Sequence, residues 1–201
     1  MVAFEGTDGA GKSTQAKAAV AWLEQNGYPA VYLKEPTDGP IGQKLRHMMV
    51  HKEHRDYMEE FRLFLEDRAE DVRLNIRPML ERGGVVCIDR YYISSMAYQG
   101  ALGLDPEFIR TENEKIAPRP DLILYFRLPL AESLRRILAS RPEGHNLFEI
   151  RSYQEKVRDI FEGMNMPNLL RVDAAQAHTE VTAQVITFVS NAIDQKRATQ
   201  A

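Results

Sequence analysis

Five short apolar runs alternate with longer segments of helical periodicity, and this alternation limits the possible folds more than any other feature. Apolar strands separated by helices imply right-handed crossovers, and hence a parallel sheet covered by helices on both faces. The predicted strands are 2–4, 30–33, 85–88, 122–126 and 169–172. The predicted helices are 12–25, 41–50, 57–80, 94–102, 106–116, 131–138, 153–161 and 179–193. We therefore predict one α/β domain over residues 1–201, with its ligands at the carboxyl ends of the strands.

The first predicted strand runs into a glycine-rich loop that has the spacing of a phosphate-binding loop. Gly6 and Gly11 bracket four residues, so the backbone N–H groups can turn inward around an anion. Lys12 then extends an ammonium toward the outer phosphates, and the Ser13 hydroxyl reaches Mg²⁺. The N-terminal end of the following helix adds its positive dipole. The loop residues are Gly6, Thr7, Asp8, Gly9, Ala10, Gly11, Lys12, Ser13 and Thr14.

Composition narrows the class of protein and its environment. Apolar residues make up 44% of the chain and charged residues 27%, as in ordinary globular proteins. The net charge of −3 disfavours a protein that coats nucleic acid, which would carry a basic patch. Cys87 is the single cysteine, so no intrachain disulfide forms, and it lies in an apolar run where an inert buried thiol is expected. No signal segment or membrane span is recognised, and we expect a cytoplasmic protein that does not bind membranes.

Charged residues follow two further predicted strands. Asp89 ends the third strand, where it would orient the waters of a metal held by Ser13. Arg90 beside it can clamp a phosphate with two parallel hydrogen bonds, although a structural Asp–Arg pair is the alternative. The segment 34–40 after the second strand is turn-rich and charged, and the sequence leaves a functional loop and a solvated loop equally open.

The long third helix carries Phe64 and Arg68 four residues apart, and hence on one face. An aromatic ring beside a guanidinium can stack on a planar base and bond its edge. For Phe64 alone, packing in the core is the simpler interpretation. The helix has more apolar residues than one core-facing stripe can hold. Part of it is therefore expected to contact a second surface, such as another subunit.

A polar segment with proline and glycine, about 139–149, separates two predicted helices and has the character of a lid. Arg135, Arg136 and Arg141 lie at its leading edge, where a closing lid would bring positive charge to a migrating phosphoryl group. Arg141 is the preferred candidate. A solvated basic helix end is the alternative, and His145 is interpreted as an exposed loop residue.

Several of these motifs, taken in order, resemble the thymidylate kinase family. The resemblance covers nearly the whole chain, and the run from Asp89 to Gly100 is its most specific part. It is carried by Phe4-Glu5 with the phosphate loop, Glu35-Pro36, Phe64 to Arg68, Asp89-Arg90-Tyr91, Ser94-Ser95, Ala97-Tyr98-Gln99-Gly100 and Pro120-Asp121.

This resemblance implies a three-layer nucleotide kinase fold with a short lid, and a homodimer that moves the γ-phosphoryl group of Mg-ATP onto dTMP. The implied catalytic residues are Lys12, Asp8, Arg90 and Arg141. The residues 6–14 would bind ATP, with Ser13, and Asp89 through water, on Mg²⁺. The implied dTMP-binding residues are Glu35, Pro36, Phe64, Arg68, Arg90, Ser94, Tyr98 and Gln99. Among these, Phe64 would stack on thymine, Arg68 and Gln99 would address its polar edge, and Tyr98 would crowd the position of a ribose 2′-hydroxyl.

The chain departs from the family pattern in three places. Gly9 and Ala10 stand where some members have a loop arginine, so catalytic charge has to come from elsewhere. The stretch Asn146-Leu147-Phe148-Glu149 has no Asp-Arg pair before the lid's closing Glu, which leaves Arg141, and as a second candidate Arg136, to supply that charge. Arg127 stands at the end of the fourth strand, where the family usually has an acidic residue. A kinase for another nucleoside monophosphate or a deoxynucleoside is therefore the first alternative. A nucleotide switch without transfer activity is the second, although no guanine-reading Asn-Lys-x-Asp segment occurs.

Overall fold

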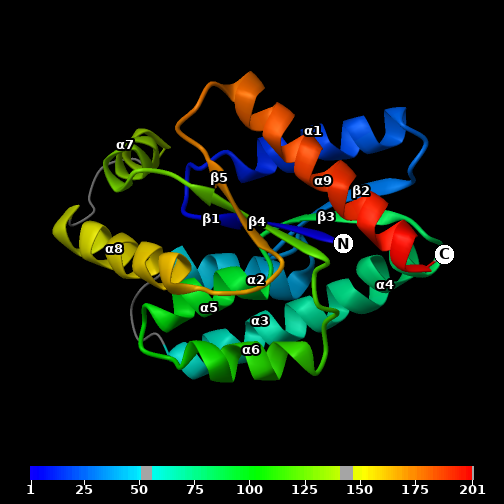
Figure 1. The fold of residues 1–201 in the computed structure, drawn as a ribbon. Helices are drawn as coiled ribbons and strands as arrows, with labels where there is room; N and C mark the ends of the chain where they lie inside the picture. Colours follow the sequence, from blue (N-terminus) through cyan, green and yellow to red (C-terminus); the bar gives the residue numbers. More distant parts are fainter. Residues whose placement is uncertain (51–55, 141–146, 201) are drawn as a thin grey trace.

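The apolar runs become the strands of one parallel sheet (Figure 1). The computed structural model describes residues 1–50, 56–140 and 147–200. Within these ranges the sheet has five strands in the order β2-β3-β1-β4-β5, which confirms the predicted fold class. The strands are β1 (Val2–Gly6), β2 (Ala30–Lys34), β3 (Val85–Asp89), β4 (Leu122–Arg127) and β5 (Leu169–Asp173).

Helices cover both faces of this sheet. Figure 1 shows α1 and α9 on one face and the group from α2 to α6 on the other, with α7 and α8 at one end. The helices are α1 (Lys12–Gln25), α2 (Pro40–Val50), α3 (Tyr57–Asp71), α4 (Arg77–Glu81), α5 (Tyr92–Gly100), α6 (Pro106–Glu114), α7 (Leu130–Ser140), α8 (Leu147–Gly163) and α9 (His178–Gln200). Among the described residues none of these helices has the length and apolar character needed to cross a membrane.

The two faces have separate apolar cores because successive strand residues point to opposite sides. Phe4 and Leu124 pack with Leu23 of α1 under α1 and α9. Ile88 and Ile123 belong to the opposite core, which includes Phe61 of α3, Tyr92 of α5 and Phe161 of α8. Complete burial of such side chains contributes about 1.5–3 kcal/mol each to folding. The sheet edge that carries the site is thus held rigidly from both sides.

The register of the sheet brings three functional loops together. Phe4 of β1 pairs with Asp89 of β3, and Lys34 of β2 pairs with the same Asp89. Gly6 lies opposite Phe126 of β4. The loops after β1, β2 and β3 therefore leave the sheet at one edge, which is where parallel sheets bind ligands.

The predicted helix 57–80 is interrupted, contrary to the sequence interpretation. A π-helical turn, η1 (Val72–Ile76), joins α3 to α4. It ends two residues before Pro78, which has no N–H to donate to the carbonyl four residues earlier in an α-helical ladder. The apolar periodicity continues through this turn, so periodicity alone did not reveal it.

Two other boundaries also differ from the prediction. The helix predicted over 179–193 is longer than expected, because α9 continues to Gln200. Lys196 donates to Asp121 at 2.8 Å, and the Arg197 guanidinium lies 4.8 Å from the Tyr28 ring centroid, so long-range contacts hold the polar end. The expected lid, 139–149, overlaps the last residues of α7 and the first of α8. Residues 141–146, including Arg141 and His145, lie outside the described residues.

Candidate active site

The phosphate loop lies between β1 and α1, in the strand–loop–helix context that its motif requires. Gly6, Gly9 and Gly11 have φ angles of 140°, 79° and 84°, which side-chain-bearing residues rarely adopt. A Cβ on Gly6 would also come within 2.6 Å of the Phe126 carbonyl oxygen. The glycines are therefore needed for the shape of the loop, and Gly6 also for its close approach to β4.

Lys12 is buried inside this loop, with its ammonium folded back on the backbone. Its Nζ donates to the Thr7 carbonyl oxygen at 2.8 Å. Burial, and then the nearby positive charge of Arg90, lowers the pKa of Lys12 to about 7. An anion bound in the loop would favour the charged ammonium and give it a better partner than a carbonyl.

Ser13 and Asp89 lie together, as the metal prediction requires. The Ser13 hydroxyl donates to Oδ2 of Asp89, and the Tyr32 hydroxyl donates to the same oxygen at 3.3 Å. The other oxygen, Oδ1, is buried and has no hydrogen-bond partner among the described residues. No group of three metal-ligating side chains occurs in the part of the chain that the structure describes. Hydroxyl and carboxylate oxygens without a full protein cage suit Mg²⁺, which keeps waters and shares substrate phosphates.

Arg90 joins the end of β3 to the phosphate loop. Its Nη2 donates to Oδ1 of Asp8, and also to the Tyr98 hydroxyl at 3.3 Å. Its guanidinium lies 4.8 Å from the centre of the Tyr98 ring, and Nη1 donates to the Ser94 hydroxyl at 3.3 Å. Residues predicted from three separate motifs thus converge on one guanidinium.

The backbone of Arg90 adopts a φ of 68°, the left-handed region that non-glycine residues seldom occupy. Its N–H donates to the Phe4 carbonyl at 3.0 Å, so the turn is tied to β1. Strain of this kind persists where the surroundings impose it, and it concentrates at functional sites. This turn directs the Arg90 side chain toward the phosphate loop.

Glu5 has a buried carboxylate beside this turn. The sequence motifs had given this residue no functional role of its own. Its Oε1 accepts the Tyr91 N–H at 2.8 Å, and its Oε2 accepts the Ser94 hydroxyl. Burial raises the pKa of Glu5 to about 7, against the lowering effects of Ser94 and Arg90. An acidic residue inside the apolar strand next to the phosphate loop was the signal available in the sequence.

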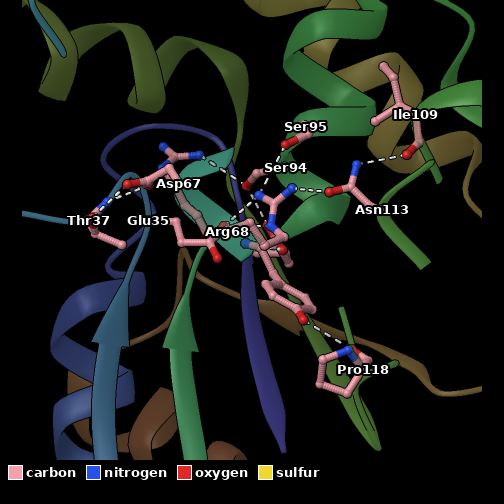
Figure 2. Close-up of polar contacts among 12 residues, drawn as sticks. Glu35, Thr37, Asp67, Arg68, Ser94, Ser95, Ile109, Asn113 and Pro118 are labelled. Atoms are coloured by element: carbon pink, nitrogen blue, oxygen red, sulfur yellow. Dashed lines mark hydrogen bonds and ion pairs between the residues drawn. The ribbon is translucent and has the colours of Figure 1, made fainter. Parts of the chain in front are cut away.

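A second arginine, Arg68 of α3, lies deeper in the protein (Figure 2). Its Nε donates to Oε2 of Glu35 at 2.8 Å, and Nη2 donates to the same oxygen. Nη2 also donates to Ser95 at 3.3 Å, and Nη1 donates to the side-chain oxygen of Asn113. Glu35 itself begins the loop after β2, where its peptide bond to Pro36 is cis. This network shows that segment 34–40 carries a buried carboxylate as well as solvated residues.

The other predicted base-binding residues differ in burial. Phe64, one helical turn before Arg68, is half-buried, so it is not the core residue that the simpler interpretation favoured. Gln99 is 2% exposed, and neither polar atom of its amide has a partner among the described residues. A buried amide in this state is unusual in a native protein and calls for a ligand or water.

The lid-edge arginines have different surroundings. Arg136 of α7 donates from Nη1 to the Gly9 carbonyl at 2.7 Å, and a Cβ on Gly9 would come within 2.9 Å of the Arg136 Cβ. Ser133, one turn earlier, donates to the Asp8 carbonyl at 2.9 Å. Arg135 pairs with Glu132 on the surface. Arg136 is therefore the arginine of this helix that contacts the phosphate loop.

The doubly covered parallel sheet and the glycine loop between β1 and α1 define a phosphate-loop nucleotide-binding protein of the α/β class. A family model described as thymidylate kinase matches residues 4–185. The chain belongs to the thymidylate kinase family, which uses ATP as phosphoryl donor.

Curated relatives support this assignment over nearly their full lengths. The thymidylate kinase of Desulfotalea psychrophila is 42% identical over 189 residues, which cover 94% of this chain and 93% of the relative. That of Akkermansia muciniphila is also 42% identical, covering 92% and 88% of the two chains. A probable thymidylate kinase of Archaeoglobus fulgidus is 38% identical and covers 98% of each. The resemblance in the sequence motifs is thereby confirmed.

Proposed function

We propose that this protein transfers the γ-phosphoryl group of ATP to dTMP, giving dTDP and ADP for dTTP synthesis. The observation that supports the proposal is the ion pair of Arg90 with Asp8, because an arginine able to clamp a phosphate thereby lies against the loop that would hold the donor. Kinase chemistry requires this arrangement of donor and acceptor phosphates within one water-excluded site. The names of the relatives point to the same reaction.

The donor end consists of the loop residues 6–14. The backbone N–H groups of the loop and the N-terminus of α1 bind the ATP phosphates. The Lys12 ammonium then donates to a phosphate oxygen in place of the Thr7 carbonyl oxygen. Ser13, with Asp89 through water, would hold Mg²⁺, which neutralises charge on the outer phosphates. Arg136, and Arg141 beyond the described residues, would supply positive charge to the migrating group.

The acceptor end combines a phosphate clamp with a base pocket. Arg90 exchanges its contacts with Asp8 and Tyr98 for the dTMP phosphate, and Ser94 steadies its guanidinium. The acceptor is already ionised, so alignment and charge stabilisation outweigh general-base catalysis.

The base pocket uses the residues of α3 and α5. Phe64 stacks on thymine, Glu35 and Pro36 border the ring, and Arg68 and Gln99 bond its polar edge. The unpartnered Gln99 amide supports this role, because N3–H and the carbonyl oxygens of thymine offer both a donor and an acceptor. A pocket that pairs with a polar edge rejects a base that leaves those groups unsatisfied.

The test is an ADP-release assay with Mg-ATP against dTMP, dUMP, dCMP, UMP, GMP and thymidine. We expect strong preference for dTMP, and a collapse of turnover in Lys12→Ala with dTMP binding retained. Another preferred acceptor would reassign the base-binding residues. ADP release that is independent of any acceptor would instead indicate a nucleotide switch.

The assembly and location of the enzyme are part of the same proposal. We propose a homodimer, supported by the exposed Tyr57 and Leu74 near the two ends of the α3–η1 segment, and sedimentation equilibrium tests it. A cytoplasmic location is supported by the free, buried Cys87 thiol, which requires no oxidising compartment.

A further inference from the structure

Asn113 closes the Arg68 network from a helix to which no motif had drawn attention. It lies in the last turn of α6 and is completely buried. Its amide nitrogen donates to the Ile109 carbonyl at 2.7 Å, and its amide oxygen accepts from Nη1 of Arg68 (Figure 2). If the Asn113 side-chain amide were rotated by 180°, its NH₂ group would face the Nη1 donor of Arg68, and two hydrogen-bond donors would oppose each other. The bond to Ile109 therefore fixes the direction in which the oxygen faces.

The hydrogen-bond capacity of Arg68 is nearly used up by the protein. A guanidinium has five N–H groups. One on Nε and one on Nη2 go to Glu35, the second on Nη2 goes to Ser95, and one on Nη1 goes to Asn113. These four contacts leave one N–H, on Nη1, without a partner among the described residues. Asn113 accepts from the same nitrogen, so it is the partner next to this remaining donor.

The flat guanidinium is also fixed across its plane. Its central carbon lies 5.2 Å from the centre of the Tyr91 ring, and the Tyr91 hydroxyl donates to the Pro118 carbonyl at 3.1 Å. Rotation of Arg68 would break the Glu35, Ser95 and Asn113 contacts together. The remaining donor thus has one orientation before any ligand enters.

We propose that Asn113 is a specificity-determining positioning residue, which aims the remaining Nη1 donor of Arg68 at position 4 of the pyrimidine. Thymine and uracil carry an acceptor oxygen at that position, whereas cytosine carries an amino donor. A fixed N–H donor therefore favours the first two bases and repels cytosine. The inference rests on the proposed function, in which Arg68 reads the base edge.

The experiment compares kcat/KM for dTMP and dCMP in the wild type and in Asn113→Leu, which removes both side-chain bonds at similar volume. We expect the dTMP-to-dCMP ratio to fall about tenfold or more, because an unaligned donor no longer discriminates, while KM for ATP stays unchanged. A purely structural role would reduce turnover of both acceptors equally. If the leucine variant fails to fold, Asn113→Ala makes the same comparison with a smaller side chain.

Two further variants sharpen the test. Asn113→Asp keeps an oxygen toward Arg68, so it should largely retain the wild-type ratio. Asn168→Leu is the matched control. The Asn168 amide also donates to a backbone carbonyl, that of Pro120 at 2.7 Å, but it has no hydrogen bond to an arginine within the described part of the chain. We expect its ratio to be unchanged.

The outcomes separate the two proposals. A wild-type enzyme that does not prefer dTMP to dCMP would overturn the proposed function. A wild-type preference that survives in Asn113→Leu and Asn113→Ala, or that Asn168→Leu loses equally, would overturn only the role of Asn113.

Discussion

Arg68 and Arg90, which we propose to bind opposite ends of the acceptor, have different surroundings in the protein. The Arg68 side chain is 1% exposed and has close partners on each of its nitrogens. The Arg90 side chain is 19% exposed, and apart from Asp8 its contacts are 3.3–3.4 Å long. Arg68 is therefore oriented by the protein before a ligand binds, whereas Arg90 can exchange several weak contacts for a phosphate.

The difference fits the groups that we propose each arginine binds. A base edge has to be distinguished from other base edges, and this requires donors with fixed directions. A phosphate is recognised by charge and two parallel hydrogen bonds, and its position changes as the reaction proceeds. Both arginines also connect to a carboxylate near the end of a strand. Arg68 donates directly to Glu35 after β2, whereas Arg90 donates to Ser94, which donates to Glu5 of β1.

The largest expected effect is the loss of stability in Arg68→Met. Removing the cation leaves the Glu35 carboxylate buried without compensation, which costs about 3–5 kcal/mol in the free energy of unfolding. Denaturant titration measures this cost, with Arg90→Met as the matched control at a more exposed site. The double variant Arg68→Met/Glu35→Gln should recover part of the loss. Equal destabilisation by the two single variants would remove the distinction between the two arginines.

Arg90→Ala should act mainly on the acceptor. Loss of a charged hydrogen-bonding partner of phosphate weakens binding by about 1.5–3 kcal/mol, so we expect dTMP affinity to fall about 10- to 100-fold. Calorimetric titration measures it, and ATP affinity should stay close to that of the wild type. Arg135→Ala, which removes a surface arginine paired with Glu132, is the control. Unaltered dTMP affinity in Arg90→Ala would exclude Arg90 from the acceptor site.

Glu5→Gln should change how stability depends on pH. Burial raises the Glu5 pKa from 4.5 to about 7, so between these values the native state binds a proton that the unfolded state has released. The free energy of unfolding therefore falls as pH rises through this window, by up to about 1.4 kcal/mol per pH unit, and levels off above pH 7. Subtracting the Glu5→Gln curve from the wild-type curve between pH 5 and 8 isolates this slope. A difference curve without a slope would contradict the raised pKa.

Arg127→Ala should have the smallest effect. Arg127 is exposed and pairs with Glu162, which also accepts from the Tyr125 hydroxyl at 3.2 Å. Exposed ion pairs contribute little to stability. We expect stability and the order of acceptors to match the wild type in the denaturant and ADP-release assays. A change in acceptor preference would mean that this departure from the family pattern reaches the site.

The sequence by itself determined the features that depend on local pattern. Apolar runs and helical periodicity predicted the α/β sheet, and glycine spacing predicted the loop before Lys12. The positions of Asp89, Arg90 and Arg68 beside predicted strand ends or on one helix face indicated them as candidate site residues. Predictions from local pattern were wrong at η1 and at the end of α9. Pro78 follows shortly after the π-helical turn, and a long-range contact with Asp121 holds the end of α9.

Only the tertiary structure decided which residues support these groups. Glu5 contacts Tyr91 and Ser94 more than 80 residues away, and Asn113 contacts Arg68 across 45 residues. Arg136 reaches Gly9 across 127 residues. Such contacts depend on strand order, register and helix packing, which bring distant segments to one sheet edge. This proximity cannot be inferred from a residue's type or from its neighbours in sequence. The residues that support the two arginines and the phosphate loop are therefore identified only from the folded structure.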